Sequence, residues 1–576
     1  MQTSMPTGGP GSRGRISPRF LLLFTALSAA LLPAAFAQDS NNVPAVPIRL
    51  NTVGFLPHAP KLASIAQPCT NFTVVRVADG TRAFAGTVSG PAVNSDTRES
   101  LYLADFSALT NAGQYRLEIP GVGSSATFAV GPDVYAAPFQ AAMLGMYLWR
   151  CGEPVRAEYH GQIFAHAACH TNDAWLDAVG GGHTNLDGTG GWHDAGDYNK
   201  YVVNAGVTLG AMVKAWEDFQ PQIKKLHVPV PESGGPLPDF LAEVKYETDW
   251  LLKMQAPDGS VYHKITTKRF GPFILPELEA EPRYFTPWGT EATADFVAML
   301  AQASRAFRPY DAAYADRCLH AASNSYAFLQ AHPNYHRADM TGFRTGSYEG
   351  PSTNATPHNR LWAVAELWQS TGSPEYLADL EKQIRGVDAK VDIDFDWAEA
   401  KNLGLLTYLF SERPGRDPAL VAQVRKNVIA AADHMVAERD RHGYGRPLGT
   451  VYFWGCNGGV ARQSLLLMAA DRLTSKGASG LSPYRTACLD ALAHLLGRNY
   501  FGRSYITGVG NFPPMHPHDR RSGGDAVEEP WPGYLVGGPN PGATDWQDNQ
   551  GNARVNEIAI NWNGALIYLL AANLAE

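Results

Sequence analysis

The chain has 576 residues, which is too long for one ordinary domain and enough for two hydrophobic cores. Its formal net charge is −8 and no basic run follows the N-terminal segment, which argues against nucleic acid or an anionic membrane as its partner. Apolar residues make up 45% of the chain, so the composition excludes a generally disordered protein. Six cysteines are too few for a disulfide scaffold of this length.

Residues 1–37 have the pattern of an export signal. Three arginines between residues 13 and 19 supply positive charge, residues 21–32 are apolar, and Ala35-Phe36-Ala37 is a small-x-small cleavage site. The pattern predicts a signal peptide, and hence a secreted or periplasmic protein with no membrane attachment after cleavage. The alternative is that the segment is retained as an anchor. No later stretch is long and apolar enough to span a bilayer.

Residues 44–132 contain short segments in which apolar and polar residues alternate. Residues 72–77 and 113–119 are typical of strands, and Asp79-Gly80 is a hairpin turn signal. Several short strands with turn signals in fewer than about 100 residues predict a β-sandwich. The segment has no row of exposed aromatic residues, so we expect it to support its neighbour rather than to bind substrate.

Residues 135–576 have apolar residues at helical spacing. About a dozen helices with little strand signal predict a helical barrel or a solenoid. A regular repeat array is disfavoured because no fixed sequence period is present. The helical patterns cover residues 139–148, 202–219, 237–254, 292–307, 312–329, 359–370, 420–436, 458–473, 489–496 and 557–574.

The run His193-Asp194-Ala195-Gly196-Asp197-Tyr198 places two carboxylates three positions apart. Gly196 permits a tight or left-handed turn between them. Because a helical pattern follows from Val202, we expect the aspartates in a turn that leads into a helix. A bare pair of this kind is usually a capping turn. Here aromatic residues flank the pair on both sides, as Trp192 and Tyr201, which is typical of a sugar-binding floor.

Two further motifs lie near the C-terminal end. Glu557 occurs in the run 546–563, and we expect a helix to begin near it. The run 502–520 ends in His518-Asp519-Arg520. Taken alone, a glutamate at a helix start is normally a partner of the helix dipole, and a His-x-Arg sequence is a solvated turn.

The three motifs, in their order along the chain, resemble the signatures of glycoside hydrolase family nine, the inverting cellulase family. The resemblance covers most of residues 46–576. It implies a mainly α fold, in which an (α/α)6 barrel over residues 135–576 follows an immunoglobulin-like β-sandwich over residues 44–132. The chain departs from the family at Ala553, where an aromatic residue is usual, and at Gly564, where serine, threonine or alanine is commoner.

The resemblance implies roles for five polar side chains. Hydrolysis with inversion needs one carboxylic acid for the leaving oxygen and one carboxylate that activates water on the opposite face. Glu557 is the expected acid and Asp197 the expected base, while Asp194 helps to position the water. His518 and Arg520 would form hydrogen bonds with sugar hydroxyls.

Aromatic residues are candidates for sugar subsites, although a large helical domain buries most of its tryptophans. Trp454 and Trp362 match positions that are aromatic in the family and are expected to bind substrate. The further candidates are Trp192, Tyr348 and Trp531.

A group of possible metal ligands precedes the two aspartates in the sequence. Cys151, Cys169, His170 and His193 match a pattern in which some immunoglobulin-bearing family members hold zinc, and zinc takes such thiolate and imidazole ligands in closed structural sites. A zinc ion on His193 would tether the loop that carries Asp194. From the residues alone, the alternatives are a free buried thiol, or a disulfide between Cys151 and Cys169, together with two unrelated histidines.

Calcium is expected to be absent or weakly bound. Many family members carry an acidic calcium loop before the helix that contains Trp362. The corresponding loop here, residues 348–359, has a single carboxylate, Glu349, whereas calcium requires several oxygen ligands. A second acidic stretch, 392–396, has three alternating aspartates but is not an EF-hand loop.

The expected activity is inverting hydrolysis of β-1,4-glucosidic bonds in cellulose-like glucans by a monomeric endoglucanase. The partner is then a β-glucan polysaccharide or oligosaccharide. One alternative is an exo-acting glycosidase on cello- or chitosan oligosaccharides, and another is an inactive carbohydrate-binding protein. Endo or exo action depends on whether a loop, such as 270–287 or 519–546, blocks one end of the cleft.

Overall fold

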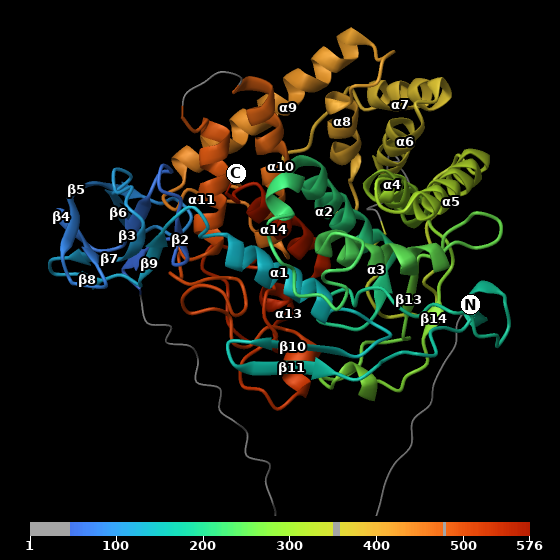
Figure 1. Cartoon of the computed structure of the whole chain (residues 1–576), viewed down its shortest axis with the longest axis horizontal. Helices are drawn as coiled ribbons and strands as arrows, with labels where there is room; N and C mark the ends of the chain where they lie inside the picture. Colours follow the sequence, from blue (N-terminus) through green and yellow to red (C-terminus); the bar gives the residue numbers. More distant parts are fainter. Residues whose placement is uncertain (1–45, 350–357, 476–479, 576) are drawn as a thin grey trace, which may run out of the picture. The chain divides into compact units, whose positions relative to one another are not determined.

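The computed structural model describes residues 46–349, 358–475 and 480–575 (Figure 1). The predicted signal peptide, residues 1–37, lies outside the described residues. Strands come first along the described chain, and a mostly helical domain follows. No helix within the described ranges is long and apolar enough to cross a membrane.

The first domain contains nine strands in the order β1-β3-β6-β5-β4-β7-β9-β2, with β8 paired to β7. The long strand β5 joins two sheets, because its first half pairs with β4 and its second half with β6. β5 changes partner between Thr87 and Val88, and the register of its pairing with β6 shifts between Ser89 and Ala92. The strands are β1 (Ile48–Arg49), β2 (Gly54–Phe55), β3 (Leu62–Ile65), β4 (Asn71–Arg76), β5 (Arg82–Val93), β6 (Ser100–Asp105), β7 (Gly113–Ile119), β8 (Gly123–Ser124) and β9 (Phe128–Val130).

Alternation of side chains builds the core of this sandwich. On β7, Tyr115, Leu117 and Ile119 are buried and the residues between them are not, as expected for a strand with one face in a core. The rings of Phe55, Phe106 and Phe128 pack together with centroids 5.4 Å apart. The β-sandwich predicted from the alternating segments is therefore present.

The second domain is built from two rings of helices. Neighbours along the inner ring pack in the order α10-α14-α2-α4-α6-α8, and Leu406 of α8 and Leu465 of α10 line one cavity. The inner helices are α2 (Val202–Ile223), α4 (Thr290–Phe307), α6 (His358–Thr371), α8 (Lys401–Phe410), α10 (Cys456–Thr474) and α14 (Ile560–Ala571). The outer helices are α1 (Ala136–Leu148), α3 (Asp239–Lys253), α5 (Ala312–Ala331), α7 (Pro374–Gly386), α9 (Pro418–Arg441) and α11 (Pro483–Leu495).

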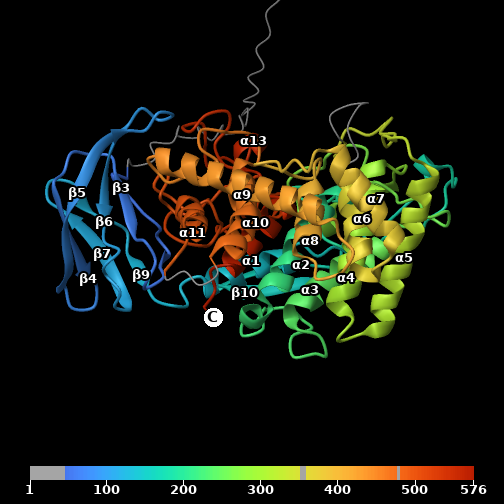
Figure 2. The same ribbon diagram turned by 90° about the horizontal axis from the view of Figure 1, so that it is seen from above.

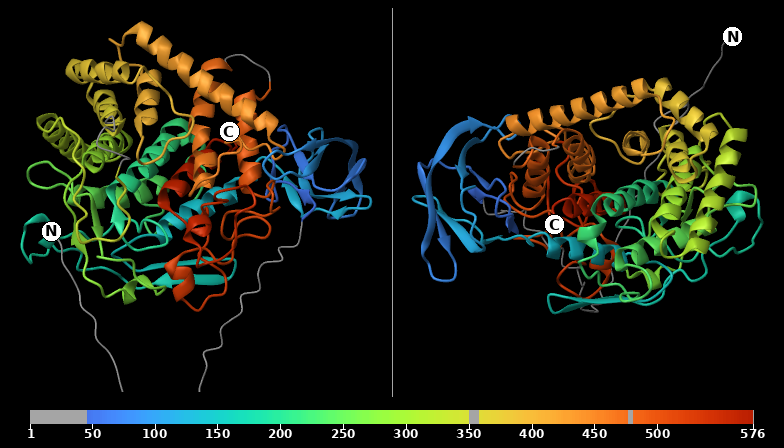
Figure 3. Two further views of the ribbon diagram at one scale, coloured as in Figure 1. Left: turned by 180° about the vertical axis from the view of Figure 1, so that it is seen from behind. Right: turned by 45° about the horizontal axis from the view of Figure 1, so that its top comes forward.

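Inner and outer helices alternate along the chain, which is the (α/α)6 arrangement. The strands of the sandwich lie beside α9 and α11 in two perpendicular views (Figures 1 and 2). Helix α9 runs along the outside of the barrel, and its C-terminal end reaches the sandwich (Figure 3). The loop after α9 contacts the sandwich directly, because the hydroxyl of Ser64 donates to the carbonyl of Gly443 at 2.8 Å.

Each of the ten predicted helical patterns coincides with a helix, but α7 and α8 were not predicted. Helix α8 is buried nearly all round, so its sequence has no polar face to give a period. Helix α7 buries only Leu380 and Ile384, which is too few apolar positions for a clear signal. The predicted helix from Glu557 begins instead at Ile560, after the short α13 (Ala553–Asn556).

The barrel domain also carries small sheets that were not predicted. Strands β10 (Val155–Tyr159) and β11 (Gln162–His166) form a hairpin. Strands β12 (Lys200–Tyr201), β13 (Lys264–Thr266) and β14 (Tyr284–Phe285) form an antiparallel sheet. Because β12 follows the aspartate motif directly, this sheet fixes where the motif enters α2.

We expect Gly533→Ala to lower the thermal unfolding temperature strongly. Gly533 has φ +87°, and an added Cβ would lie 1.9 Å from the carbonyl oxygen of Ala141 in α1. Left-handed backbone costs an alanine about 1–2 kcal/mol, and steric overlap adds ~1–3 kcal/mol. Gly342→Ala is the matched control, because Gly342 has φ +89° with open space around it. Equal losses in the two variants would contradict the close packing of this loop on α1.

Candidate active site and metal cluster

A cavity of about 670 Å³ is lined by the loops that precede inner helices. Residues 194–201 precede α2, residues 344–348 precede α6, Trp454 precedes α10, and residues 553–559 precede α14. Since successive inner helices are separated by one outer helix, these loops meet at one end of the barrel. The cavity brings together most of the predicted site residues, namely Asp194, Asp197, Trp454, His518, Arg520 and Glu557.

A ladder of backbone hydrogen bonds joins three loops that are far apart in the sequence. Ala195 forms an antiparallel bridge with Ala559, and the Ile560 amide donates to the Asp194 carbonyl at 2.9 Å. The His518 amide donates to the Asn556 carbonyl at 2.7 Å. We call residues 194–196, 518–520 and 556–560 the backbone ladder. It determines where Asp197 and Glu557 stand relative to each other.

Gly196 is required for close approach within this ladder rather than for a left-handed turn. Its φ is not positive, which differs from the turn allowed for in the sequence. A Cβ at this position would lie 2.0 Å from the carbonyl oxygen of His518. The Gly196 carbonyl in turn accepts from the Arg520 amide at 3.1 Å. Any larger residue would therefore separate the aspartate loop from the His518 loop.

Asp197 has one oxygen held and one oxygen without a protein partner. Its Oδ1 accepts from the Asn199 amide at 2.7 Å and from the Asn199 side chain at 2.9 Å. Asn199 is itself fixed by the Thr267 amide on the loop after β13, at 2.9 Å. Within the described ranges no hydrogen-bond donor reaches Asp197 Oδ2, and the residue lines the cavity. Burial raises the pKa of Asp197, partly offset by the charge of Arg520.

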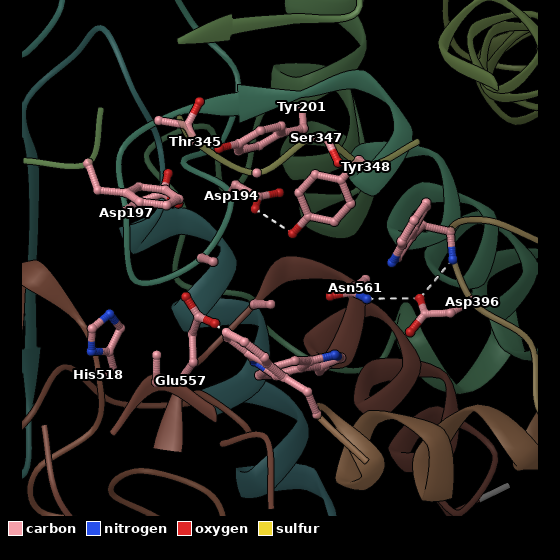
Figure 4. A pocket seen from close by; sticks show the side chains of 18 of the residues that line it. Asp194, Asp197, Tyr201, Thr345, Ser347, Tyr348, Asp396, His518, Glu557 and Asn561 are labelled. Atoms are coloured by element: carbon pink, nitrogen blue, oxygen red, sulfur yellow. Dashed lines mark hydrogen bonds between the residues drawn. The ribbon is translucent and has the colours of Figure 1, made fainter. Parts of the chain in front are cut away.

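Both oxygens of Asp194 have hydrogen-bond donors. Asn204 of α2 donates to Oδ1 at 2.7 Å, and the Tyr348 hydroxyl donates to Oδ2 at 2.8 Å (Figure 4). Burial and the charge of Asp197 raise the pKa of Asp194 well above its usual range. Asp194 is thus held firmly and bears directly on the ionisation of its neighbour.

Glu557 lies across the cavity from the two aspartates (Figure 4). The backbone of Glu557 is extended between α13 and α14, and it pairs with the backbone of His518 in the backbone ladder. The indole N–H of Trp454 donates to Oε2 at 3.1 Å. Burial and the charges of Asp197 and Asp194 raise the pKa of Glu557 to about 8, although Trp454 and Arg520 act in the opposite direction. Glu557 is therefore mainly protonated at neutral pH.

His518 and Arg520 differ in how free they are to reach a ligand. His518 Nδ1 donates to the Gln550 carbonyl at 2.7 Å, and burial lowers its pKa. The neutral ring therefore keeps Nε2 as an acceptor. Arg520 donates to the carbonyls of Gly271 at 2.9 Å and Gly196 at 2.7 Å, so it ties loops together as well as lining the cavity.

The structure separates the aromatic candidates into two groups. Trp454 is 52% exposed and lines the cavity together with Tyr348. Trp362, which the sequence predicted to bind substrate, is instead fully buried in α6, where its indole N–H donates to Glu366 at 3.1 Å. Trp192 and Trp531 are likewise core residues. A tryptophan packed on both faces has no surface left on which a sugar could stack.

Several cavity residues were missed by reasoning from the sequence. They are Phe270, Asp396, Trp397, Asn561 and Trp562. Asn561 donates to Asp396 at 2.9 Å, which joins the start of α14 to the loop before α8 (Figure 4). Asn561 and Trp562 lie in the same run as Glu557, so that run could have indicated them. Ala553 forms part of the cavity wall, so the departure from the family changes the cavity lining.

Cys151, Cys169, His170 and His193 form a cluster whose ligand atoms all lie within 4.8 Å of one another. Cys151 Sγ is 3.6 Å from His170 Nδ1, and Cys169 Sγ is 3.7 Å from His193 Nε2. Both cysteines are free thiols, so the alternative of a disulfide between them is wrong. Two sulfurs and two imidazole nitrogens in a buried cluster fit a closed tetrahedral zinc site.

The surroundings of this cluster connect it to the aspartate loop. The Glu279 carboxylate lies 3.2 Å from His170 Nε2, the usual arrangement for orienting a metal-binding histidine. The His193 amide donates to the Trp149 carbonyl at 2.8 Å, and the Trp149 indole donates to the Ala195 carbonyl at 3.1 Å. Trp149 therefore connects His193 of the cluster to Ala195 of the backbone ladder.

A second group of possible metal ligands is less favourable. His358, Asp392 and Glu399 lie close enough to share an ion, but the Lys401 ammonium pairs with Asp392. Asp396 pairs with Arg462 at 2.8 Å, so a cation of the protein neutralises it too. Most of the loop in which calcium was expected to be absent, residues 350–357, lies outside the described residues. The statement about calcium stays a prediction.

We expect the Glu557 carboxyl to titrate near pH 8, and Asp197→Asn to lower that pKa by ~1 unit or more, because a nearby negative charge is removed. Titration by NMR of protein carrying ¹³C-labelled glutamate, with Glu557→Gln to assign the signal, measures both values. Glu277→Gln, which changes a glutamate away from the cavity, is the control variant. A titration near the ordinary glutamate value would contradict the electrostatic coupling.

Comparisons with known proteins agree with this arrangement. A family model described as glycosyl hydrolase family 9 matches residues 135–570, and one described as a cellulase N-terminal ig-like domain matches residues 44–124. Endoglucanase D of Acetivibrio thermocellus is 50% identical over 552 residues, covering 96% of this chain and 86% of that protein. A xyloglucan-specific endo-β-1,4-glucanase of Bacteroides ovatus is 32% identical, covering 96% and 98%.

Solved structures give the same result. A metagenome-derived family 9 endoglucanase has a TM-score of 0.84 at 33% identity, covering 92% of this chain and 99% of that one. A zinc-binding triple mutant of the family 9 endoglucanase J30 has a TM-score of 0.83 at 30% identity, covering 90% and 99%. The resemblance found in the sequence and the predicted fold class are confirmed. The chain therefore belongs to glycosyl hydrolase family 9, as a glycoside hydrolase with an N-terminal immunoglobulin-like domain.

Proposed function

We propose that this chain is an endo-β-1,4-glucanase that hydrolyses cellulose-like glucans with inversion at the anomeric carbon. Its 50% identity to an endoglucanase over nearly the whole chain supports the substrate and the endo mode of action. The observation that carries the mechanism is that Glu557, whose pKa is raised to about 8, faces Asp197 across one cavity, where no donor from the described residues reaches Asp197 Oδ2. This is the pairing of acid and base that inverting hydrolysis requires.

Asp197 is the general base. Its Oδ1 is occupied by two hydrogen bonds from Asn199, so Oδ2 remains to take a proton from water. The water attacks the anomeric carbon as the glycosidic bond breaks, and its proton passes to Asp197. Asp194 helps to place that water, and the Tyr348 hydroxyl and Asn204 hold Asp194 still for this task.

Glu557 is the general acid. A carboxyl group with a pKa of about 8 carries its proton at neutral pH and can deliver it to the departing oxygen. When the proton leaves, the Trp454 N–H already lies 3.1 Å from Oε2 and stabilises the new carboxylate. His518 Nε2 can accept a hydrogen bond from a sugar hydroxyl, and Trp454 and Tyr348 offer rings to sugar faces.

We propose that Cys151, Cys169, His170 and His193 hold one zinc ion. Bound there, zinc would supply structural crosslinking and no open position for water, since four protein ligands complete its shell. His193 then fixes the segment that leads to Asp194, which keeps the aspartate loop in register with the backbone ladder. We also propose export from the cytoplasm, supported by the signal pattern of residues 1–37.

We expect Glu557→Gln to reduce kcat on a soluble β-1,4-glucan by about 10²–10⁴-fold, because the leaving oxygen loses its proton donor. With a dinitrophenyl cellobioside, whose leaving group needs no proton, most of the activity should return. Asp197→Asn should lose activity on both substrates, which makes it the matched comparison. Loss of both activities in Glu557→Gln would contradict the assignment of Glu557 as the acid.

The stereochemistry and the pH dependence test the same mechanism independently. Proton NMR of the first product should show the α-anomer, and kcat should fall as pH rises through about 8, because Glu557 then loses its proton. A β-anomer as the first product would exclude the inverting arrangement. A wild type that hydrolyses no glucan would favour the exo-acting or carbohydrate-binding alternatives.

We expect elemental analysis to find about one zinc per chain in the wild type and almost none in Cys151→Ser, because one ligand of a closed site is lost. Cys488→Ser is the matched control, since Cys488 is also a buried free thiol but lies outside the cluster. The Cys151 variant should also unfold at lower temperature than the Cys488 variant. Equal zinc content in the two variants would contradict the proposed site.

A further inference from the structure

One turn of the sandwich holds a loop of the barrel domain by a buried carboxylate. The turn, residues 94–99, joins β5 to β6, and the loop, residues 442–455, joins α9 to α10. Asp96 Oδ2 accepts from His442 Nε2 at 3.0 Å and from the Tyr452 hydroxyl at 2.5 Å. The Asp96 side chain of the first domain therefore bonds to this loop at two residues that are ten positions apart.

Other contacts anchor the beginning of the same loop. Asn94 accepts from the Gly443 amide at 2.9 Å. Glu99 accepts from the Tyr444 hydroxyl at 2.5 Å and pairs with Arg49 at 2.9 Å. These contacts lie near residue 443, far along the chain from Trp454. Asp96 is thus the turn residue that also reaches the end of the loop close to the cavity.

Asp96 is ionised over the whole working pH range. Burial opposes its ionisation, but the hydrogen bonds from His442 and Tyr452 lower its pKa to about 2. Burial lowers the pKa of His442, so the neutral ring donates from Nε2 to Asp96 and accepts the Tyr444 amide at Nδ1, 3.2 Å away. Both hydrogen bonds are therefore to an ionised carboxylate, and the one from the Tyr452 hydroxyl is short.

The end of the loop that Asp96 holds, at Tyr452, lies next to the residue that contacts Glu557. Trp454 follows Tyr452 by two residues, and its indole N–H donates to Glu557 Oε2 at 3.1 Å. The loop has no helix or strand between α9 and α10 to hold it. Gly455 closes it with φ +86°, packed so tightly that a Cβ would lie 2.5 Å from the Trp562 ring. The position of the Trp454 indole thus depends on Tyr452 on one side and Gly455 on the other.

We propose that Asp96 of the immunoglobulin-like domain is a positioning residue for Glu557, and that it acts by holding Tyr452 and thereby the Trp454 N–H. The inference rests on the proposed role of Glu557 as the general acid. Asp96 touches no substrate. Its effect is to keep one donor aimed at the carboxyl that must give up a proton.

The consequence is a change in the pH dependence of hydrolysis. The charged groups that face Glu557 are Asp197, Asp194 and Arg520, and the Trp454 N–H is its neutral donor. Aspartate charges favour the protonated form, whereas Arg520 and Trp454 favour the carboxylate. When the Trp454 donor moves away, the pKa of Glu557 rises, so the fall in kcat at high pH moves to higher pH.

The test compares pH profiles of kcat on a soluble β-1,4-glucan for wild type, Tyr452→Phe, Asp96→Asn and Trp454→Phe. Trp454→Phe removes the N–H directly and should move the alkaline limb up by about 0.5–1 pH unit. Tyr452→Phe and Asp96→Asn should move it in the same direction and lower kcat at pH 7 by ~10-fold, because the donor is misplaced. In the Trp454→Phe background, Tyr452→Phe should produce no further shift.

Tyr444→Phe is the matched control. It also removes a tyrosine hydroxyl that bonds to the turn 94–99, but at the beginning of the loop and away from Trp454. It should lower the unfolding temperature about as much as Tyr452→Phe while leaving the alkaline limb in place. Equal shifts in Tyr444→Phe and Tyr452→Phe, or no shift in Tyr452→Phe, would overturn the role of Asp96. No shift in Trp454→Phe would likewise overturn the inference, because the Trp454 donor would then not act on Glu557. Failure of the proposed role of Glu557 shows separately, as loss of activity on both the glucan and the dinitrophenyl cellobioside in Glu557→Gln, so the two failures are distinguishable.

Discussion

The backbone ladder is the constraint on which the active site depends. Asp197 and Glu557 are separated by 360 positions in the numbering. What places them is main-chain pairing, Ala195 with Ala559 and His518 with Glu557. Main-chain pairing cannot rotate as side chains do, so it fixes the two carboxyls with the precision that proton transfer needs. The absence of a Cβ at Gly196 is what allows the strands of this ladder to approach.

The backbone ladder brings three carboxyl groups close together, and their surroundings determine which of them carries a proton. Burial raises the pKa values of all three carboxyl groups around the cavity, and the charge of a neighbouring aspartate adds to this at Asp194 and Glu557. The hydrogen bonds then decide the roles. Asp197 is stabilised as a carboxylate by two donors from Asn199, whereas the part of the chain that the structure describes offers Glu557 one donor, the Trp454 indole. The proposed base and the proposed acid are thus similar side chains in different surroundings.

Site residues could be predicted from the sequence where they lie in short, distinctive motifs. The aspartate pair, Glu557 and His518 could be predicted to share a site because each lies in a distinctive motif. Trp362 could not be judged correctly, because a tryptophan in a helical pattern looks the same whether it faces a cavity or a core. Asp396 was missed as a cavity residue because its partner Asn561 lies far along the chain. The role of Asp96 could not be predicted from the sequence, because it depends on contacts with residues about 350 positions away.

The location of the protons at rest tests this account most directly. A neutron crystal structure of the perdeuterated protein at pH 7 would show them. The account predicts a deuteron on Glu557 and none on Asp197 Oδ2. A deuteron on Asp197 with a bare Glu557 carboxylate would exchange the acid and the base, and would contradict the electrostatic ordering that the backbone ladder imposes.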